Sequence, residues 1–293
     1  MATDITLIIP TLGRKNDIIR LLNSLNDCII SEKINLELII VDQNNPAFGL
    51  ESIINEFKHK IKVKYIHSEK KGLSHNRNKA LKECKLNDFI LFTDDDNVFE
   101  KLFFVNLRKH INTLKSFDLL IGNALNHEDK EPYTYNINQE KIDRLRLRDF
   151  KKIISWNIIL PKEKLKSVGF FDESFGVGSF YGACEESDFV IRILNRRESI
   201  VYSLPDCKIF HPKRSKNYQN FSRNKNYSFG FGAFYKKQIK LYQFKIQFYF
   251  FMDFLRLLIL SFGGLILYIF NNHRRKHYTN SITYKIKGFI QYL

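Results

Sequence analysis

The sequence predicts an α/β protein in which a mostly parallel sheet is flanked by helices, as in a Rossmann-like fold. Short apolar segments rich in β-branched residues alternate with segments whose apolar residues recur every three or four positions. This alternation is typical of parallel strands covered by helices on both faces. Acidic residues follow several predicted strands, and ligands of such sheets bind beyond the carboxyl ends of the strands.

The first half of the chain contains four predicted strands and three predicted helices. The strands are apolar runs bounded by polar residues: Ile5–Pro10, Leu36–Val41, Val63–His67 and Phe89–Thr93. The helices have apolar residues at helical spacing, as at Ile18, Ile19, Leu22 and Leu25 of the first: Asn16–Leu25, Glu51–Phe57 and Ser74–Cys84.

The second half has weaker periodicity. From about Asn126 to Arg148 the sequence is polar and charged, which predicts a mobile loop with a short helix. Ile153–Leu160 is apolar again, and Pro161–Val168 resembles a short helix ended by Gly169. A further helical run covers Phe189–Leu194.

Length and cysteine content limit the class of protein. At 293 residues with 44% apolar residues, the chain has room for one large α/β domain with an appendage or for two modest domains. The cysteines lack C-x-x-C spacing, which indicates a reducing compartment and neither a disulfide framework nor a zinc site. They are Cys28, Cys84, Cys184 and Cys207. No charged and apolar signal sequence follows Met1, so we expect a cytoplasmic protein unless a later segment anchors it.

Positive charge is concentrated at the C-terminus. The net charge of +16 arises almost wholly from residues 208–293, where 16 Lys and Arg face the single acid Asp253. Residues 1–207 hold 31 Lys and Arg against 30 acids and are nearly neutral. A basic C-terminal segment favours nucleic acid or an anionic membrane surface as its partner.

The apolar composition of this segment favours the membrane surface. Phe248–Phe270 approaches the roughly 20 residues of a span, but Asp253, Arg256 and Gly263-Gly264 interrupt it. The uninterrupted part, Leu257–Phe270, is too short to cross. Flanking Lys and Arg and many aromatic residues predict an interfacial or re-entrant helix pair. The alternative is a buried helical interface of a homodimer.

The most informative motif is Thr93-Asp94-Asp95-Asp96, which ends the apolar run Phe89–Phe92. Burying three adjacent carboxylates without partners would cost several kcal/mol, so positive charge is expected beside them. Carboxylates at an open strand end suit a hard divalent cation that also binds phosphate oxygens. A solvated acidic turn is the alternative.

Seven segments in this order resemble the family 2 glycosyltransferases of the GT-A fold, of the type that builds bacterial surface polysaccharides. The resemblance covers roughly residues 4–235 and rests on these segments: Leu7–Thr11, Leu38–Asn44, Lys71–Asn78, Phe92–Asp96, Val168–Glu173, Cys184–Asp188 and Phe210–Pro212. It implies a transferase domain at 1–235, with a nucleotide-sugar-binding half at 1–125 and an acceptor-binding half at 126–235. Residues 236–293 then form a basic, aromatic, amphipathic helical tail.

The resemblance implies donor-binding residues. Asp42 would accept hydrogen bonds from the nucleotide base, although capping the turn that follows is a common use of Asp. Arg77 would pair with a phosphate or with Asp94. The remaining donor-binding residues are expected to be Pro10, Thr11, Arg14 and Asp95.

The resemblance also implies a Mn²⁺ or Mg²⁺ ion held by the DxD pair. Asp96 is expected to bind the metal directly, with Asp94 nearer the ribose, and His211 is a further candidate ligand. A His ligand would favour Mn²⁺ over Mg²⁺. A surface or hydrogen-bonded role is the alternative for a lone His.

The catalytic base is expected in Cys184-Glu185-Glu186-Ser187-Asp188. The family has Glu-Asp here and uses the second residue as base, which indicates Glu186, with Glu185 as the alternative. The family also implies inversion at the anomeric carbon. Asp188 is a candidate acceptor-binding residue, although its spacing to Arg192 favours a salt bridge.

Trp156 and Asn157 are the other candidate acceptor-binding residues, since an aromatic face packs on sugar C–H groups. Core packing is the alternative for Trp156. The predicted reaction moves a sugar from a nucleotide-sugar donor to a hydroxyl of a glycan or lipid-linked acceptor, at the inner face of the cell membrane. A nucleotidyltransferase and a nucleic-acid-binding protein are the competing functions, and the tail lacks the recognition signatures expected of the latter.

Overall fold

The computed structural model describes residues 2–29, 33–47, 49–50, 54–55, 61–114, 116–133, 138–213 and 220–292. The chain divides into two compact units. Unit 1 consists of Met1–Phe171 and Glu186–Lys213, and unit 2 consists of Asp172–Glu185 and Arg214–Leu293.

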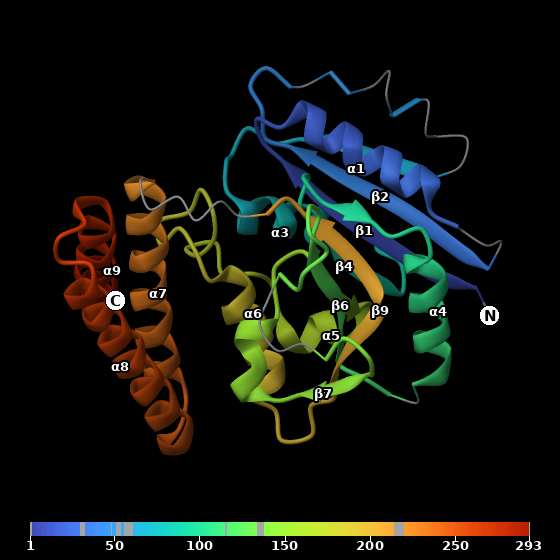
Figure 1. Cartoon of the computed structure of the whole chain (residues 1–293). Helices are drawn as coiled ribbons and strands as arrows, with labels where there is room; N and C mark the ends of the chain where they lie inside the picture. The colour runs from blue at the N-terminus through green and yellow to red at the C-terminus, as the bar shows by residue number, and fades with distance from the viewer. Residues whose placement is uncertain are drawn as a thin grey trace. The chain divides into compact units, whose positions relative to one another are not determined.

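Unit 1 is built on a mixed sheet (Figure 1). The strand order within the described residues is β3-β2-β1-β4-β8-β6-β9-β5, and β7 pairs with β9 outside this path. The strands are β1 (Thr3–Thr11), β2 (Ile34–Asp42), β3 (Lys62–His67), β4 (Phe89–Phe92), β5 (Val98–Phe99), β6 (Leu119–Asn126), β7 (Asp143–Leu145), β8 (Ile158–Pro161) and β9 (Val201–His211).

The first four strands form a parallel half-sheet with a topological switch point. Strand β1 lies between β2 and β4 and is parallel to both, and β3 is parallel to β2. The chain therefore moves outward from β1 to β3 and returns to β4 on the other side of β1. Ligands of open α/β sheets bind at the carboxyl ends of the strands beside such a reversal.

The remaining strands make the sheet mixed. Strand β8 is antiparallel to β4 and β6, while β5 and β7 are antiparallel to β9. Strand β9 is parallel to β6. The expected Rossmann-like sheet flanked by helices is confirmed, and its parallel character is strongest in the first half of the chain.

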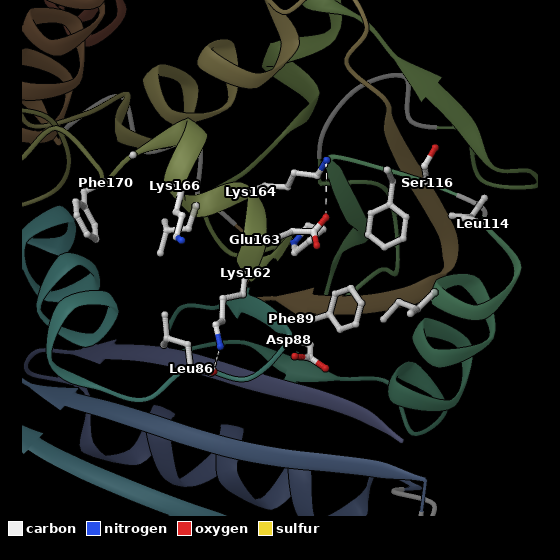
Figure 2. A pocket seen from close by; sticks show the side chains of 15 residues that line it. Leu86, Asp88, Phe89, Leu114, Ser116, Lys162, Glu163, Lys164, Lys166 and Phe170 are labelled. Carbon is white, nitrogen blue, oxygen red and sulfur yellow. Dashed lines mark hydrogen bonds and ion pairs between the residues drawn. The ribbon is translucent and has the colours of Figure 1, made fainter. Parts of the chain in front are cut away.

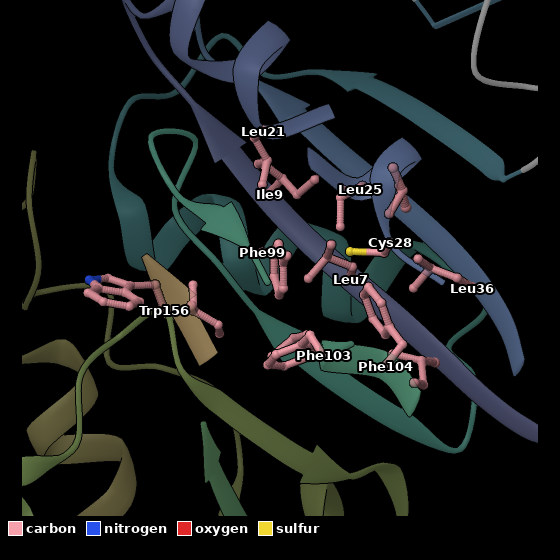
Figure 3. Close-up of a cluster of buried hydrophobic side chains, with 14 of the residues drawn as sticks. Leu7, Ile9, Leu21, Leu25, Cys28, Leu36, Phe99, Phe103, Phe104 and Trp156 are labelled. Atoms are coloured by element: carbon pink, nitrogen blue, oxygen red, sulfur yellow. The ribbon is translucent and has the colours of Figure 1, made fainter. Parts of the chain in front are cut away.

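Helices cover both faces of this sheet. The helices of unit 1 are α1 (Lys15–Asp27), α3 (Leu73–Glu83), α4 (Phe103–Thr113), α5 (Lys162–Val168) and α6 (Glu185–Leu194), with a 3₁₀ helix, η1 (Leu147–Lys152). Apolar side chains of α1 and α4, such as Leu21 and Phe103, pack against Leu7 and Ile9 of β1 (Figure 3). On the other face Phe92 meets Phe171 edge-on, with ring centroids 5.2 Å apart.

The predicted elements of the first half are confirmed with small shifts of their ends. Only Ile54 and Asn55 of the predicted helix Glu51–Phe57 are described, and both are helical; the rest lies outside the described residues. Gly169 ends α5 with φ of 78°, as expected. In the segment 126–148, described except for 134–137, the structure has strand β7, and the short helix appears at its end as η1.

Unit 2 contains three long helices, α7 (Phe221–Leu241), α8 (Phe244–Leu267) and α9 (Asn272–Gln291). Glycines permit close packing of α7 on α9. A Cβ on Gly232 would lie 1.9 Å from the Lys285 carbonyl oxygen, and one on Gly288 would lie 2.0 Å from that of Phe229. No other residue fits these two positions without moving the helices apart.

Asp253, Arg256 and Gly263-Gly264 lie within α8 without ending it, so the helix is longer than the expected apolar stretch Leu257–Phe270. The Tyr235 hydroxyl of α7 donates to Asp253 at 2.5 Å, so this carboxylate is paired inside the unit. Gly264 allows the Tyr278 ring to approach, since a Cβ there would lie 2.3 Å from it. By length and apolarity alone, α8 meets the requirement for a membrane span, as the core helix of a soluble protein also would.

The domain limits predicted at residues 125 and 235 differ from the limits of the two compact units. Residue 235 lies inside α7 and residue 125 lies inside β6, so neither is a break between elements. The assignment of donor, acceptor and tail functions to these parts stays a prediction.

Candidate active site

Acidic residues lie together at the switch point of unit 1. Asp94, Asp95 and Asp96 follow β4 after Thr93, while Thr11 ends β1 beside them. Because β1 and β4 are parallel, their carboxyl ends meet at one edge of the sheet. This arrangement brings the loop after β1 into contact with the carboxylates.

Asp95 is the carboxylate that holds the loop after β1. The Thr11 hydroxyl donates to its Oδ2 at 2.8 Å, and the Leu12 amide donates to the same oxygen at 3.4 Å. The Arg14 guanidinium donates to Oδ1 at 3.1 Å. Burial raises the pKa of Asp95 to about 6, against the opposing effect of Arg14. In this structure the predicted donor-binding residue Asp95 therefore supports the loop.

Asp96 lies between two cationic or metal-binding side chains. Its Oδ2 accepts from Arg14 at 2.5 Å, and its Oδ1 lies 3.3 Å from Nε2 of His211. Burial raises the pKa of Asp96 as well. His211 is the last residue of β9, a strand that is distant from β4 in the sequence and ends beside the carboxylates.

The residues present fit a divalent cation. Asp94, Asp96 and His211 each offer a ligand atom, and these atoms all lie within 4.8 Å of one another. Nδ1 of His211 lies 2.7 Å from the Pro212 carbonyl oxygen, which can only accept, so this nitrogen carries a proton. Nε2 then faces Asp96, whose buried Oδ1 accepts no hydrogen bond from the described residues. Carboxylate oxygens with one imidazole nitrogen suit Mn²⁺ or Mg²⁺.

Arg77 pairs with Asp94, which is one of its two predicted partners; the other was a phosphate. Its guanidinium donates to Asp94 Oδ1 at 2.9 Å, and the Arg77 side chain is fully buried. The rings of Phe92 and Phe171 lie 5.9 Å and 5.5 Å from the guanidinium carbon. Stacked between apolar rings and joined to a carboxylate, Arg77 is a fixed positive charge of the site.

Asp42 caps the turn that follows β2. Its Oδ1 accepts from the Asn44 amide at 2.9 Å, and its other oxygen accepts from the Tyr65 hydroxyl. This turn-capping role was one of the two alternatives and is confirmed. A contact of Asp42 with a nucleotide base stays a prediction. Pro10, the other predicted donor-site residue, is buried within β1 opposite Val41.

The two predicted acceptor residues just before β8 lie in the core. Asn157 is fully buried, accepts from the Ile154 amide at 3.1 Å and donates to the Gly122 carbonyl at 3.0 Å. Trp156 is 1% exposed and stacks on His211. Tyr133, which the sequence did not single out, packs edge-on against Trp156.

The predicted catalytic carboxylates lie at the start of α6. Glu185 is its first residue and is buried, while Glu186 is half-buried. Asp188 lies 3.5 Å from Arg192 and is 2% exposed, which confirms the predicted salt bridge. The roles of Glu185, Glu186 and Asp188 in catalysis or acceptor binding stay predictions.

A cavity of about 990 Å³ lies elsewhere in unit 1 (Figure 2). It is lined by Asp88 and Phe89, at the amino end of β4, and by the lysines of α5. The carboxylates follow the opposite end of β4, so this cavity is separate from the candidate active site.

Comparison with known proteins identifies the family. Residues 6–186 match the model of Glycosyl transferase family 2. A chondroitin synthase of Pasteurella multocida is 26% identical over 210 residues, which are 58% of this chain and 21% of that protein. The chain thus spans about a fifth of the length of this relative.

Solved structures share the fold. S. aureus TarS 1–349 in complex with UDP-GlcNAc superposes with a TM-score of 0.60 at 16% identity, covering 99% of this chain and 92% of that one. The mannosyltransferase PcManGT from Pyrobaculum calidifontis, in complex with GDP-Man and Mn²⁺, gives a TM-score of 0.60 at 12% identity. That match covers 100% of this chain and 87% of the mannosyltransferase. The family model matches more than half of the residues, and the protein is a glycosyltransferase that belongs to family 2.

Proposed function

We propose that this enzyme is an inverting, metal-dependent transferase that moves a sugar from a nucleotide-sugar donor to a hydroxyl of a glycan or lipid-linked acceptor. The observation that supports it best is the cluster of Asp94, Asp96 and His211 at the switch point of the sheet. Family membership favours glycosyl transfer over nucleotidyl transfer and nucleic-acid binding. The two structural neighbours were solved with nucleotide-sugar donors, UDP-GlcNAc and GDP-Man, which supports a nucleotide-sugar donor for this enzyme.

The residues of the site suit a charged diphosphate leaving group. A bound Mn²⁺ or Mg²⁺ would neutralise the charge that develops on the leaving nucleoside diphosphate. Asp96 and His211 would hold the cation, and Asp94 would be oriented by the buried Arg77. Because burial raises the pKa of Asp96, a cation would also compensate the cost of keeping that carboxylate charged.

Glu186 is the proposed general base. The acceptor hydroxyl loses its proton as its oxygen attacks the anomeric carbon, and a carboxylate within hydrogen-bond reach receives that proton. The half-buried Glu186 lies in the first turn of α6, where the helix dipole favours a negative charge. Glu185 is the alternative base, although it is almost fully buried.

We further propose that unit 2 holds the enzyme at an anionic membrane surface, where a lipid-linked acceptor would lie. Helix α8 exposes many large apolar side chains, which would be costly in water alone. They include Phe244, Phe248, Phe251, Met252, Ile259, Leu260, Phe262, Ile266 and Leu267. Basic residues and aromatic rings of the same unit suit the interface between lipid headgroups and water.

Replacing Asp96 by Asn tests the proposed metal role. The variant keeps the shape of the side chain but loses the charge, so sugar transfer and Mn²⁺-dependent stabilisation by UDP or GDP should both be lost. A screen of nucleotide sugars, with and without Mn²⁺, should find one donor that raises the Tm of the wild-type protein only with the metal. Full activity in EDTA, or unchanged turnover by Asp96→Asn, would contradict the proposal.

A further inference from the structure

The two arginines at the carboxylates differ in how firmly they are held. Arg77 is fully buried between two phenylalanine rings, whereas the Arg14 side chain is 50% exposed. Arg14 nevertheless makes the shortest ion pair of the site, at 2.5 Å from Asp96. An exposed arginine on a long, flexible stem can change partner at little cost, while a buried and stacked one cannot.

The backbone at Arg14 permits such a change of partner. Arg14 follows Gly13, which has φ of 74° and no described heavy atom within 4 Å of the place where a Cβ would lie. It also precedes the first turn of α1, where the helix dipole favours a bound anion such as phosphate. A phosphate bound there would be stabilised by the helix and could accept hydrogen bonds from Arg14.

The charge balance of the site provides the reason for the exchange. Asp94, Asp95 and Asp96 together carry three negative charges when ionised, and Arg77 compensates one of them. Two negative charges remain, which one divalent cation neutralises completely. With the cation on Asp96, Arg14 would be a surplus positive charge beside the carboxylates and a suitable partner for the diphosphate that accompanies the metal.

We propose that Arg14 is an exchangeable counter-ion, bound to Asp95 and Asp96 in the free enzyme and transferred to the donor diphosphate when a divalent cation takes its place. This inference rests on the proposed metal-dependent function. Arg14 then restrains the binding of metal alone and promotes the binding of metal together with nucleotide. Cation and donor would thus enter as a pair.

Two binding measurements on Arg14→Gln test the exchange. Mn²⁺ alone, titrated by electron paramagnetic resonance of the free ion, should bind Arg14→Gln about tenfold more tightly than wild type. The reason is that the charged hydrogen bond from Arg14 no longer competes with Mn²⁺ for Asp96. UDP or GDP, titrated by calorimetry at saturating Mn²⁺, should bind the same variant about tenfold more weakly. Opposite changes from one substitution are the signature expected of a side chain that exchanges partners.

Arg20→Gln is the matched control. The Arg20 guanidinium contacts the Asp96 carbonyl at 3.4 Å and pairs with Asp17 at 2.8 Å, so it carries the same charge nearby without touching a carboxylate of the site. Its loss should change both dissociation constants less than twofold. A general effect of net charge would instead tighten Mn²⁺ binding equally in both variants.

The possible outcomes distinguish failure of the Arg14 exchange from failure of the proposed metal-dependent function. If Mn²⁺ and nucleotide bind wild type, but Arg14→Gln changes neither constant or weakens both, the exchange is refuted and the metal-dependent function stands. If Mn²⁺ binds neither protein, with or without nucleotide, the metal role fails and the exchange with it. Arg14→Lys, which keeps the charge but not the forked geometry, should fall between wild type and Arg14→Gln in both titrations.

Discussion

Trp156 lies flat against the imidazole of His211, with ring centroids 5.1 Å apart and planes inclined by 17°. Together with the hydrogen bond from Nδ1 to the Pro212 carbonyl, this stacking fixes the direction of Nε2 toward Asp96. The tryptophan expected to meet an acceptor sugar therefore orients the candidate metal ligand in this structure. Its own indole N–H is buried and has no hydrogen-bond partner among the described residues.

Replacing Trp156 by Leu should weaken Mn²⁺ binding. Side chains that orient metal ligands are typically worth about 10- to 100-fold in metal affinity, and Leu offers no flat surface to the imidazole. Trp156→Phe is the matched control, because it keeps an aromatic face and loses an unpaired N–H; its affinity should stay within a few-fold of wild type. Equal Mn²⁺ dissociation constants for Trp156→Leu and wild type, measured with nucleotide present, would speak against this role.

Replacing Glu186 by Gln should lower the transfer rate by about 10²-fold or more, because the amide cannot accept the proton of the acceptor hydroxyl. Donor binding should remain near normal, since the substitution keeps the size of the side chain. Single-turnover transfer and nucleotide titration measure the two effects separately. If Glu185→Gln is the inactive variant and Glu186→Gln is active, the base is Glu185.

Replacing Ile259 and Ile266 by Glu should release the protein from vesicles that contain phosphatidylserine. The two side chains are 69% and 71% exposed on α8, so the substitutions remove apolar contact with lipid without disturbing the core. Flotation with vesicles measures the bound fraction, and high salt should release wild type only in part. Truncation before Lys236 is a poor test of the same idea, because it would cut α7.

The control for this experiment adds the same charge elsewhere. Asn112 and Thr113 are exposed at the end of α4 in unit 1, and replacing both by Glu should leave vesicle binding unchanged. A wild-type protein that does not float with anionic vesicles, but forms a dimer lost in the Ile259→Glu and Ile266→Glu variant, would favour the alternative dimer interface.

The free energy of unfolding should increase as the pH rises from about 8 toward 10.5, because buried Lys285 then loses its charge. Its ammonium is buried and donates to the hydroxyls of Ser261 and Ser281, each at 2.8 Å, and no carboxylate of the described residues pairs with it. Burial lowers the pKa of Lys285 to about 8 from a usual value of 10.5. Between these values the unfolded chain binds more protons at this residue than the folded one, so the free energy of unfolding increases with pH.

Lys285→Met should remove that increase, which the pKa values put on the order of 3 kcal/mol across the interval. Lys287→Met, at an exposed position of the same helix, should keep it. Denaturant unfolding of the three proteins at several pH values supplies the comparison. A slope for Lys285→Met that equals the wild-type slope would show that Lys285 is charged throughout.

The sequence alone determined the parallel half-sheet and the positions of the carboxylates. Strands such as Ile5–Pro10 and Phe89–Phe92 are covered on both faces of the sheet. Such strands consist almost entirely of apolar residues, so they can be recognised from the sequence alone. Asp94 to Asp96 follow such a run closely in the sequence, so their place at the end of a strand could be predicted from neighbouring residues alone. The same holds for the cap at Asp42 and for the salt bridge of Asp188 with Arg192, which depend on residues only a few positions apart.

Only the tertiary structure decided the partners of those carboxylates. His211 reaches Asp96 because β9 pairs with β5 and β6, and Trp156 reaches His211 from the start of β8; no local pattern encodes contacts between such distant segments. Likewise, the partner of Asp253 in α8 is a hydroxyl of α7, which lies 18 residues away in the sequence. Local propensity and periodicity fix short elements, whereas burial and pairing of polar groups are settled when distant elements pack together.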